Sequence, residues 1–396
     1  MKLQSFLLGG AFATVYGLDQ ACPDEYCAGD VINVEPSIDS TTICPGLGWE
    51  TLQTFEHDGD VLIELRGPSN MADAADLVIS APHGGDLKPA YIADRATSGP
   101  YCPSTCKTAK DSYTKEISEL LQEKFIQNYC KVPFLVINHL HRSKLDANRE
   151  ISEAAQGVAL AAEAWMKFHT YISMAQVELR DHFGTSTVYS STGSAKTGVH
   201  ALLFDMHGYA GYDWDSTNGS PLIQWGYRFS DDSLEYCPLD SRSAYSIGTL
   251  THARWMDGHS YECLVRGPRS LASRLTDLII DSGDLFFDSD SLCGFGTPSN
   301  EFPSPKTLAN SEEFCEDMGD SNPDECHYYS GGYDVEVHER MGWQDEENLS
   351  GDHFNAIQAE LPRCIRFGGS SLRETFADHL SIATMSFLRD LHGDMP

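Results

Sequence analysis

No part of this sequence limits the possible folds more than the ten residues Leu77-Val-Ile-Ser-Ala-Pro-His-Gly-Gly-Asp86. Its first five residues are mostly apolar and include Val and Ile, which predicts a buried strand. Pro82 ends that strand, and His83 and Asp86 follow on a glycine-containing turn. Open α/β sheets place their ligands at the carboxyl ends of strands. A histidine and a carboxylate three residues apart can both reach one metal ion, and these ligand types suit zinc. A plain surface turn is the alternative.

Apolar patterns predict an alternation of strands and helices along the rest of the chain. Such alternation indicates an α/β fold with three layers, in which helices cover both faces of a mixed, largely parallel sheet. Further strands are expected at 61–66, 133–138, 201–207, 334–338 and 355–361. Helices are expected from 111 onward, over 150–183 as one helix or a pair, and over 270–280 and 370–391.

The composition bounds the class of protein. The net charge of −32 over 396 residues disfavours partners that need basic patches, such as nucleic acid or an anionic membrane surface. Residues 1–17 resemble a secretory signal peptide, and no later stretch is long and apolar enough for a membrane helix. We expect a Cys-rich extension over 18–60 and one catalytic domain over 61–396, with a loop-rich insertion at about 284–330.

The cysteines agree with export from the cell. Twelve are present and none forms a CxxC pair, so disulfides in an oxidising compartment account for them better than a zinc knuckle does. Local pairs are possible for Cys22–Cys27, Cys102–Cys106 and Cys315–Cys326, although sequence does not fix the pairing. Asn218 and Asn348 begin glycosylation sequons. We therefore expect a secreted glycoprotein.

Polar residues recur where the predicted strands end. The positions are His83 with Asp86, the run Arg142 to Arg149, His207, and Gln358 with Glu360. Because the carboxyl ends of parallel strands meet at one edge of a sheet, these groups can converge there. Two histidines and one carboxylate form a catalytic type of zinc site, to which we assign His83, Asp86 and His207.

The neighbouring polar residues suit further roles. Asp205 points the same way along its strand as His207 and can orient that ligand. Glu360 suits a general base that takes a proton from water near the metal. Asn148 with Arg149 suits a binding site for the substrate carboxylate. Arg142 could hold either a second acidic group of the substrate or the developing oxyanion. Each residue alone also has an ordinary structural explanation, such as a buried hydrogen bond or an ion pair.

Six short motifs resemble the N-formylglutamate amidohydrolase family, which belongs to a wider zinc carboxypeptidase-like group. They appear in the family's order over about residues 75–365. They are Pro82-His-Gly-Gly85, Asp111 with Thr114, Arg142-x-x-x-Asp146-x-Asn148-Arg149, Asp205-Met-His207, Tyr329-Ser-Gly-Gly332 and Gln358-x-Glu360.

The resemblance implies a phosphorylase/hydrolase-like fold with one zinc ion per chain. It also implies hydrolysis of an N-acyl amide on an acidic amino acid. The ligand positions of the group fall on His83, Asp86 and His207, its base on Glu360, and its carboxylate anchor on Asn148 and Arg149. Further substrate contacts are expected from Gln358, Tyr333 and Arg340, and Asp146 joins Asp205 in orienting the ligands.

The chain also departs from the family. Asp86 stands where the carboxypeptidase-like relatives use a longer Glu, and Gly84 and Gly208 replace small hydroxyl residues. Our first hypothesis is a secreted zinc amidohydrolase that acts on N-acyl amino acids or γ-glutamyl amides. A secreted metallocarboxypeptidase is the second, with a small molecule or peptide bearing a free carboxylate as substrate in both cases. A non-catalytic binding protein on the same fold is the third.

Overall fold

The computed structural model describes residues 44, 46–189, 195–209, 223–228, 265, 269–282, 331–339, 341 and 352–392. Its strands form one sheet in the order β1-β2-β4-β3-β6-β8-β7, with β5 paired to β6. The strands are β1 (Trp49–His57), β2 (Asp60–Pro68), β3 (Ala74–Ala81), β4 (Val132–Asn138), β5 (Thr185–Tyr189), β6 (Ala195–Gly208), β7 (Gln224–Gly226) and β8 (His353–Leu361).

The four central strands, β4, β3, β6 and β8, run parallel to one another. The outer pairings, β1 with β2, β2 with β4, β5 with β6 and β7 with β8, are antiparallel. The carboxyl ends of β3, β6 and β8 therefore lie along one edge of the sheet, as a parallel arrangement requires. This confirms the predicted mixed, largely parallel sheet.

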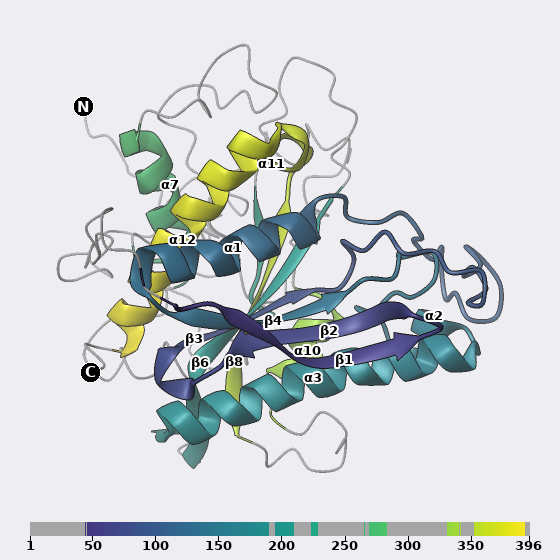
Figure 1. The fold of residues 1–396 in the computed structure, drawn as a ribbon, viewed down its shortest axis with the longest axis horizontal. Coiled ribbons are helices and arrows are strands. Elements are labelled where there is room, and N and C mark those ends of the chain that lie inside the picture. Colours follow the sequence, from purple (N-terminus) through teal and green to yellow (C-terminus); the bar gives the residue numbers. More distant parts are fainter. Residues whose placement is uncertain are drawn as a thin grey trace, which may run out of the picture.

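Helices cover both faces of the sheet (Figure 1). One apolar core holds buried residues of α1, α7 and α12, and a second core on the other face holds those of α3 and α10. Together they give the predicted three layers. The helices are α1 (Thr114–Tyr129), α2 (Ile151–Ala155), α3 (Ala159–Phe183), α7 (Leu271–Ser282), α10 (Tyr333–His338), α11 (Arg363–Phe367) and α12 (Ser370–His392).

Alternation along the central strands decides where the polar groups lie. Val78, Leu203 and Ala356 pack in the core beneath α3. Side chains two residues apart on a strand share a face, so the positions that follow them point to the same side. Those positions are Ser80 on β3, Asp205 and His207 on β6, and Gln358 and Glu360 on β8. Near its carboxyl edge, the face beneath α3 thus changes from apolar to polar.

One expectation about local structure is wrong, because residues 334–338 form the short helix α10 rather than a strand. The strand β1 lies within the range 18–60 of the expected Cys-rich extension. The Asp-Val-Glu-Val-His alternation of α10 mimics a strand, yet Asp334, Val335 and His338 are the buried positions, which is a helical spacing. The 150–183 region is a pair of helices, α2 and α3.

Two disulfides are present among the described residues. Cys102–Cys106 is one of the local pairs considered from the sequence, whereas Cys44–Cys130 joins the start of the described chain to the end of α1 and was not expected. No described helix combines the length and apolar character that a bilayer crossing needs. Several predicted features lie outside the described residues: the signal peptide, the 284–330 insertion, Arg340, Asn218, Asn348 and the pairs Cys22–Cys27 and Cys315–Cys326.

Candidate metal centre

The turn after β3 brings His83 into the protein interior. A Cβ on Gly84 would lie 2.4 Å from the backbone nitrogen of Lys115, and one on Gly85 would lie 2.3 Å from the carbonyl carbon of His139. Only glycine allows the chain to pass this close to the first turn of α1 and to the loop after β4. The glycine pair therefore fixes the path of the turn, and His83 is only 1% exposed.

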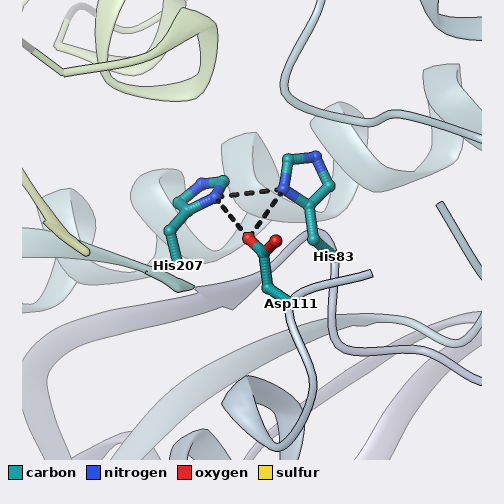
Figure 2. A group of neighbouring side chains, drawn as sticks. All are labelled: His83, Asp111 and His207. Carbon is teal, nitrogen blue, oxygen red and sulfur yellow. Dashed lines mark hydrogen bonds and ion pairs between the residues drawn. The ribbon is translucent and has the colours of Figure 1, made fainter. Parts of the chain in front are cut away.

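Three buried side chains from distant segments converge at the carboxyl edge of the sheet. His83 Nδ1 lies 3.1 Å from His207 Nδ1, and Asp111 Oδ2 lies 3.2 Å from the first nitrogen and 3.3 Å from the second. Figure 2 shows the three groups pointing toward one another. Tetrahedral zinc with bonds of 2.0–2.1 Å separates its ligand atoms by about 3.3–3.4 Å. The triangle therefore has the size of three corners of a zinc site.

Each histidine is held from behind by a carboxylate. His83 Nε2 is 2.6 Å from Asp146 Oδ1, and His207 Nε2 is 2.8 Å from Asp205 Oδ2. Ser80 Oγ donates a 2.6 Å hydrogen bond to Asp205 Oδ1. Metal-binding histidines usually donate their second ring N–H to such a carboxylate, which fixes the tautomer and the ring orientation. Both Nδ1 atoms are thereby left to face the centre.

Charged neighbours decide the ionisation of the centre. Burial alone would raise the pKa of the Asp111 carboxyl, but hydrogen bonds from His207 and His83 and nearby positive charge hold it far below its usual range. Burial would lower the pKa of His207, yet Asp205 and Asp111 raise it well above the usual value. The pKa of Asp146 is lowered despite its burial, chiefly by His83 and Arg142. The surroundings thus favour positive charge between Asp111 and the two rings.

The carboxylate that faces the two histidines is Asp111, not Asp86 as predicted from the sequence. The side chain of Asp86 is 81% exposed and forms an ion pair with Lys110. Leu87 pairs with Leu140 directly after the turn, and its N–H donates to His139 O, which directs Asp86 outward. Asp111 precedes α1, where its N–H donates to His83 O. The Asp-x-x-Thr motif already marked Asp111, but the sequence analysis gave this residue no role at the metal.

Glu360 lies beside the centre on the neighbouring strand. It is the register partner of His207 across the β6–β8 pairing, and it is 8% exposed. Gln358 Nε2 donates a 3.2 Å hydrogen bond to Glu360 Oε1, while Gln358 Oε1 accepts from the N–H of Gly332. Gln358 is fully buried, so the structure places it behind Glu360 rather than in a position open to substrate.

The 142–149 run divides into buried and accessible residues. Arg142 donates to Asp146 Oδ2 at 2.9 Å and to Asp111 Oδ1 at 3.4 Å. Asn148 is 2% exposed; its Nδ2 lies 3.1 Å from His207 Nε2, and its Oδ1 accepts from the N–H of Asp334. Arg149 differs, because 36% of its side chain is exposed. Of this run, Arg149 is the residue best placed to meet a solute.

Tyr333 stands at the start of α10, partly buried. Its ring lies 5.7 Å from that of His169 and 6.1 Å from that of Trp165, centroid to centroid. Gly332 precedes it, and a Cβ there would lie 2.2 Å from Asn148 Nδ2. The Gly-Gly turn before α10 is therefore required for the helix to approach the centre.

A buried arginine, which the sequence had not singled out, joins the segments of the site. Arg366 Nε donates to Leu361 O at 3.1 Å, Nη1 donates to Ser112 O at 3.0 Å, and Nη2 donates to Tyr209 O. These carbonyls follow Glu360, Asp111 and His207 closely in the chain. Gly208 leaves room for the guanidinium, since a Cβ there would lie 2.4 Å from Nε.

The fold and the centre define an α/β protein with a buried histidine–carboxylate group at the carboxyl edge of its sheet, able to hold a divalent cation. Neither the known family models nor the curated proteins contain a match. Solved structures do match. One is N-formylglutamate amidohydrolase from Ralstonia eutropha JMP134, with 12% identity, a TM-score of 0.41, and coverage of 84% of this chain and 99% of that one.

A second matching structure is gene product Atu2144 from Agrobacterium tumefaciens. It shares 13% identity and has a TM-score of 0.36, with coverage of 84% of this chain and 96% of that one. The first of the two proteins carries the name of the family that the six sequence motifs resemble.

Proposed function

We propose that this chain is a zinc-dependent hydrolase that cleaves the amide bond of an N-acyl amino acid or a γ-glutamyl amide. The observation that carries the proposal is the triangle of His83 Nδ1, His207 Nδ1 and Asp111 Oδ2, with edges of 3.1–3.3 Å. Two imidazoles and one carboxylate are the ligand number and type of catalytic zinc sites, which leave one position open.

The donor set fits zinc for a further reason. Two ring nitrogens 3.1 Å apart repel unless a cation or a proton lies between them, and Asp111 adds a charged oxygen to the same point. A bound zinc ion supplies a Lewis acid for the amide carbonyl and lowers the pKa of a coordinated water molecule. We assign His83, Asp111 and His207 as its ligands, and Asp146 and Asp205 as the groups that orient the two rings.

Glu360 is the proposed general base. It accepts a proton from the attacking water and passes it to the leaving amine, so that no net proton is gained or lost at Glu360. The hydrogen bond from Gln358 Nε2 holds Glu360 Oε1 and so orients the carboxylate. Its register with His207 places it one strand from the centre.

The substrate carboxylate is assigned to Arg149, whose guanidinium can bind a carboxylate through two parallel hydrogen bonds. Arg142 and Asn148, which the sequence analysis placed at the substrate, instead position the centre: Arg142 holds Asp111 and Asp146, and Asn148 holds α10 against His207. Arg340 is outside the described residues. Its substrate contact remains part of the proposal, as does one from Tyr333.

Secretion is also part of the proposal. The N-terminal sequence predicts it, and two disulfides are compatible with an oxidising compartment.

The decisive experiment measures zinc content and hydrolysis together. The purified protein should hold zinc and release amine from a panel of N-acyl amino acids and γ-glutamyl amides. Asp111→Asn should lose the hydrolysis and the zinc ion held by this centre. Glu360→Gln should keep the zinc but lose about 10²–10⁴-fold in kcat. The matched control is Asp86→Asn, which removes an exposed carboxylate and should change neither. Full activity in Glu360→Gln would refute the assigned base.

The same panel separates the two enzymatic hypotheses. Blocked dipeptides with a free C-terminus should be poor substrates if the proposal holds, whereas a metallocarboxypeptidase would prefer them. A protein that holds zinc yet hydrolyses neither class would favour the third hypothesis, a binding protein on this fold.

A further inference from the structure

The ring of His207 faces two groups of potential ligands. Its Nδ1 belongs to the centre described above, and its Nε2 faces Asp205, with Oδ2 2.8 Å away. Asp334, the second residue of α10, completes the other group. Ligand atoms of Asp205, His207 and Asp334 all lie within 4.8 Å of one another, and all three residues are at most 1% exposed.

Asp334 is the unusual member. Its side chain is fully buried, and neither carboxylate oxygen has a hydrogen-bond partner among the described residues. His169 Nε2 lies 4.0 Å from Oδ1, and that nitrogen already faces Ala147 O. A buried carboxylate without partners loses several kcal/mol of solvation. Some group must therefore compensate it.

A proton can neutralise Asp334, but it supplies no hydrogen bond to either carboxylate oxygen, and neither oxygen has a donor among the described residues. A cation would satisfy the oxygen directly and would also bind Asp205 and His207. The 2.8 Å separation of His207 Nε2 and Asp205 Oδ2 is close to the about 2.9 Å between neighbouring ligands of a six-coordinate ion with bonds near 2.05 Å.

We propose that Asp205, His207 and Asp334 form a second divalent-cation site, so that the imidazole of His207 bridges two ions. The proposal rests on the proposed function only in taking the Nδ1 side of the ring as the first site. On binding, the ion takes the place of the Nε2 proton between His207 and Asp205, and that proton leaves to solvent. Asp205 then changes from a hydrogen-bond acceptor to a ligand, while Ser80 still holds its other oxygen.

The mixed nitrogen and oxygen donors suit Zn²⁺ or Mn²⁺. Asn148 lies against the same region: its Nδ2 is 3.1 Å from His207 Nε2, and its Oδ1 accepts from the Asp334 N–H at 2.8 Å. By accepting from the Asp334 N–H, Asn148 thus holds the backbone of Asp334 beside the histidine. This hydrogen bond explains why Asp334 on α10 stays next to His207 on β6.

The test is a count of bound ions. The full chain, stripped with a chelator and dialysed against buffered Zn²⁺, should bind two equivalents by elemental analysis. Asp334→Asn, which keeps the shape of the side chain, should bind one, and Asp111→Asn should also bind one because it affects the other site. Asp86→Asn should bind two. Saturation of the unaltered protein at one equivalent would overturn the proposal, and would indicate that water or a proton occupies the space beside Asp334.

A second measurement does not depend on the variants folding well. Two Cu²⁺ ions bridged by one imidazolate are magnetically coupled, so the electron paramagnetic resonance signal should not double with the second equivalent. Independent signals would contradict the bridge. The outcomes also separate the two proposals. One equivalent that is lost in Asp111→Asn supports the catalytic site alone, and one that is lost only in Asp334→Asn supports the second site alone.

Discussion

A buried histidine pair should make the stability of this protein depend on pH. His169 on α3 is fully buried; its Nε2 lies 3.2 Å from Ala147 O and its Nδ1 lies 2.9 Å from His338 Nε2. Since Ala147 O can only accept, Nε2 carries the proton and Nδ1 accepts from His338. A second proton on Nδ1 would face the His338 N–H. Burial lowers the pKa of His169 from 6.5 to about 3, against a small opposing effect of the Ala147 carbonyl.

The sign follows from proton binding. Between pH 6.5 and about 3 the unfolded chain binds a proton at this histidine and the folded protein does not, so the free energy of unfolding falls as the pH falls. The contribution of His169 to the free energy of unfolding is fully present well above pH 6.5. From pH 7 to pH 5 the loss due to His169 is about 2 kcal/mol, at about 1.36 kcal/mol per pKa unit.

Urea unfolding at pH 7 and pH 5 measures this loss. His169→Gln removes the titrating group, so the variant should lose about 2 kcal/mol less than the unaltered protein between the two pH values. His182→Gln, at the exposed end of α3, is the control and should behave like the unaltered protein. An equal loss in both variants would refute the reasoning, because it would mean that His169 accepts a proton in the folded state.

Three other perturbations test close packing and buried polar contacts. Gly85→Ala should lower the melting temperature strongly, because the added Cβ would meet backbone atoms; the expected loss of stability is about 3 kcal/mol or more. Gly48→Ala is the control, since its Cβ would point into open space and should leave the melting temperature unchanged. Ser80→Ala should weaken zinc binding about tenfold in a chelator competition, since Asp205 loses its 2.6 Å hydrogen bond; unchanged affinity would show that Asp205 needs no support. Asp390→Asn leaves two buried guanidinium groups without their carboxylate, and should cost about 3 kcal/mol in denaturant unfolding; a cost under 1 kcal/mol would contradict this.

Most of the central sheet could be predicted because its strands are apolar runs bounded by turn residues. The 77–81, 133–138 and 201–207 runs all lie within strands of the observed sheet. Helix α10 could not be predicted in this way. Six residues are too few to separate a period of 3.6 from a period of 2. The helix is also held by hydrogen bonds to distant segments, from the Asp334 N–H to Asn148 and from Gln176 to the His338 carbonyl.

The candidate centre shows the same division. The two histidines could be identified because a strand that ends in a polar residue is readable in the sequence. The carboxylate of the group could not, because Asp86 and Asp111 both lie on loops near His83. What separates them is the backbone path after Gly85, where Leu87 pairs with Leu140 and directs Asp86 to solvent. The two paired residues are more than fifty positions apart, so the pairing cannot be recognised from a local sequence pattern.

The disulfide between Cys44 and Cys130 encloses much of this architecture. Its loop spans 86 residues and includes His83 and Asp111, while His207 and Glu360 lie beyond it. In the chain-entropy account, a cross-link of this span restricts the unfolded chain by the equivalent of about 4–5 kcal/mol. Material produced in a reducing cytosol would lack that restraint on the N-terminal half of the centre. Recombinant samples for these assays therefore need an oxidising route of expression, because inactivity of a reduced sample would report on the host rather than on the protein.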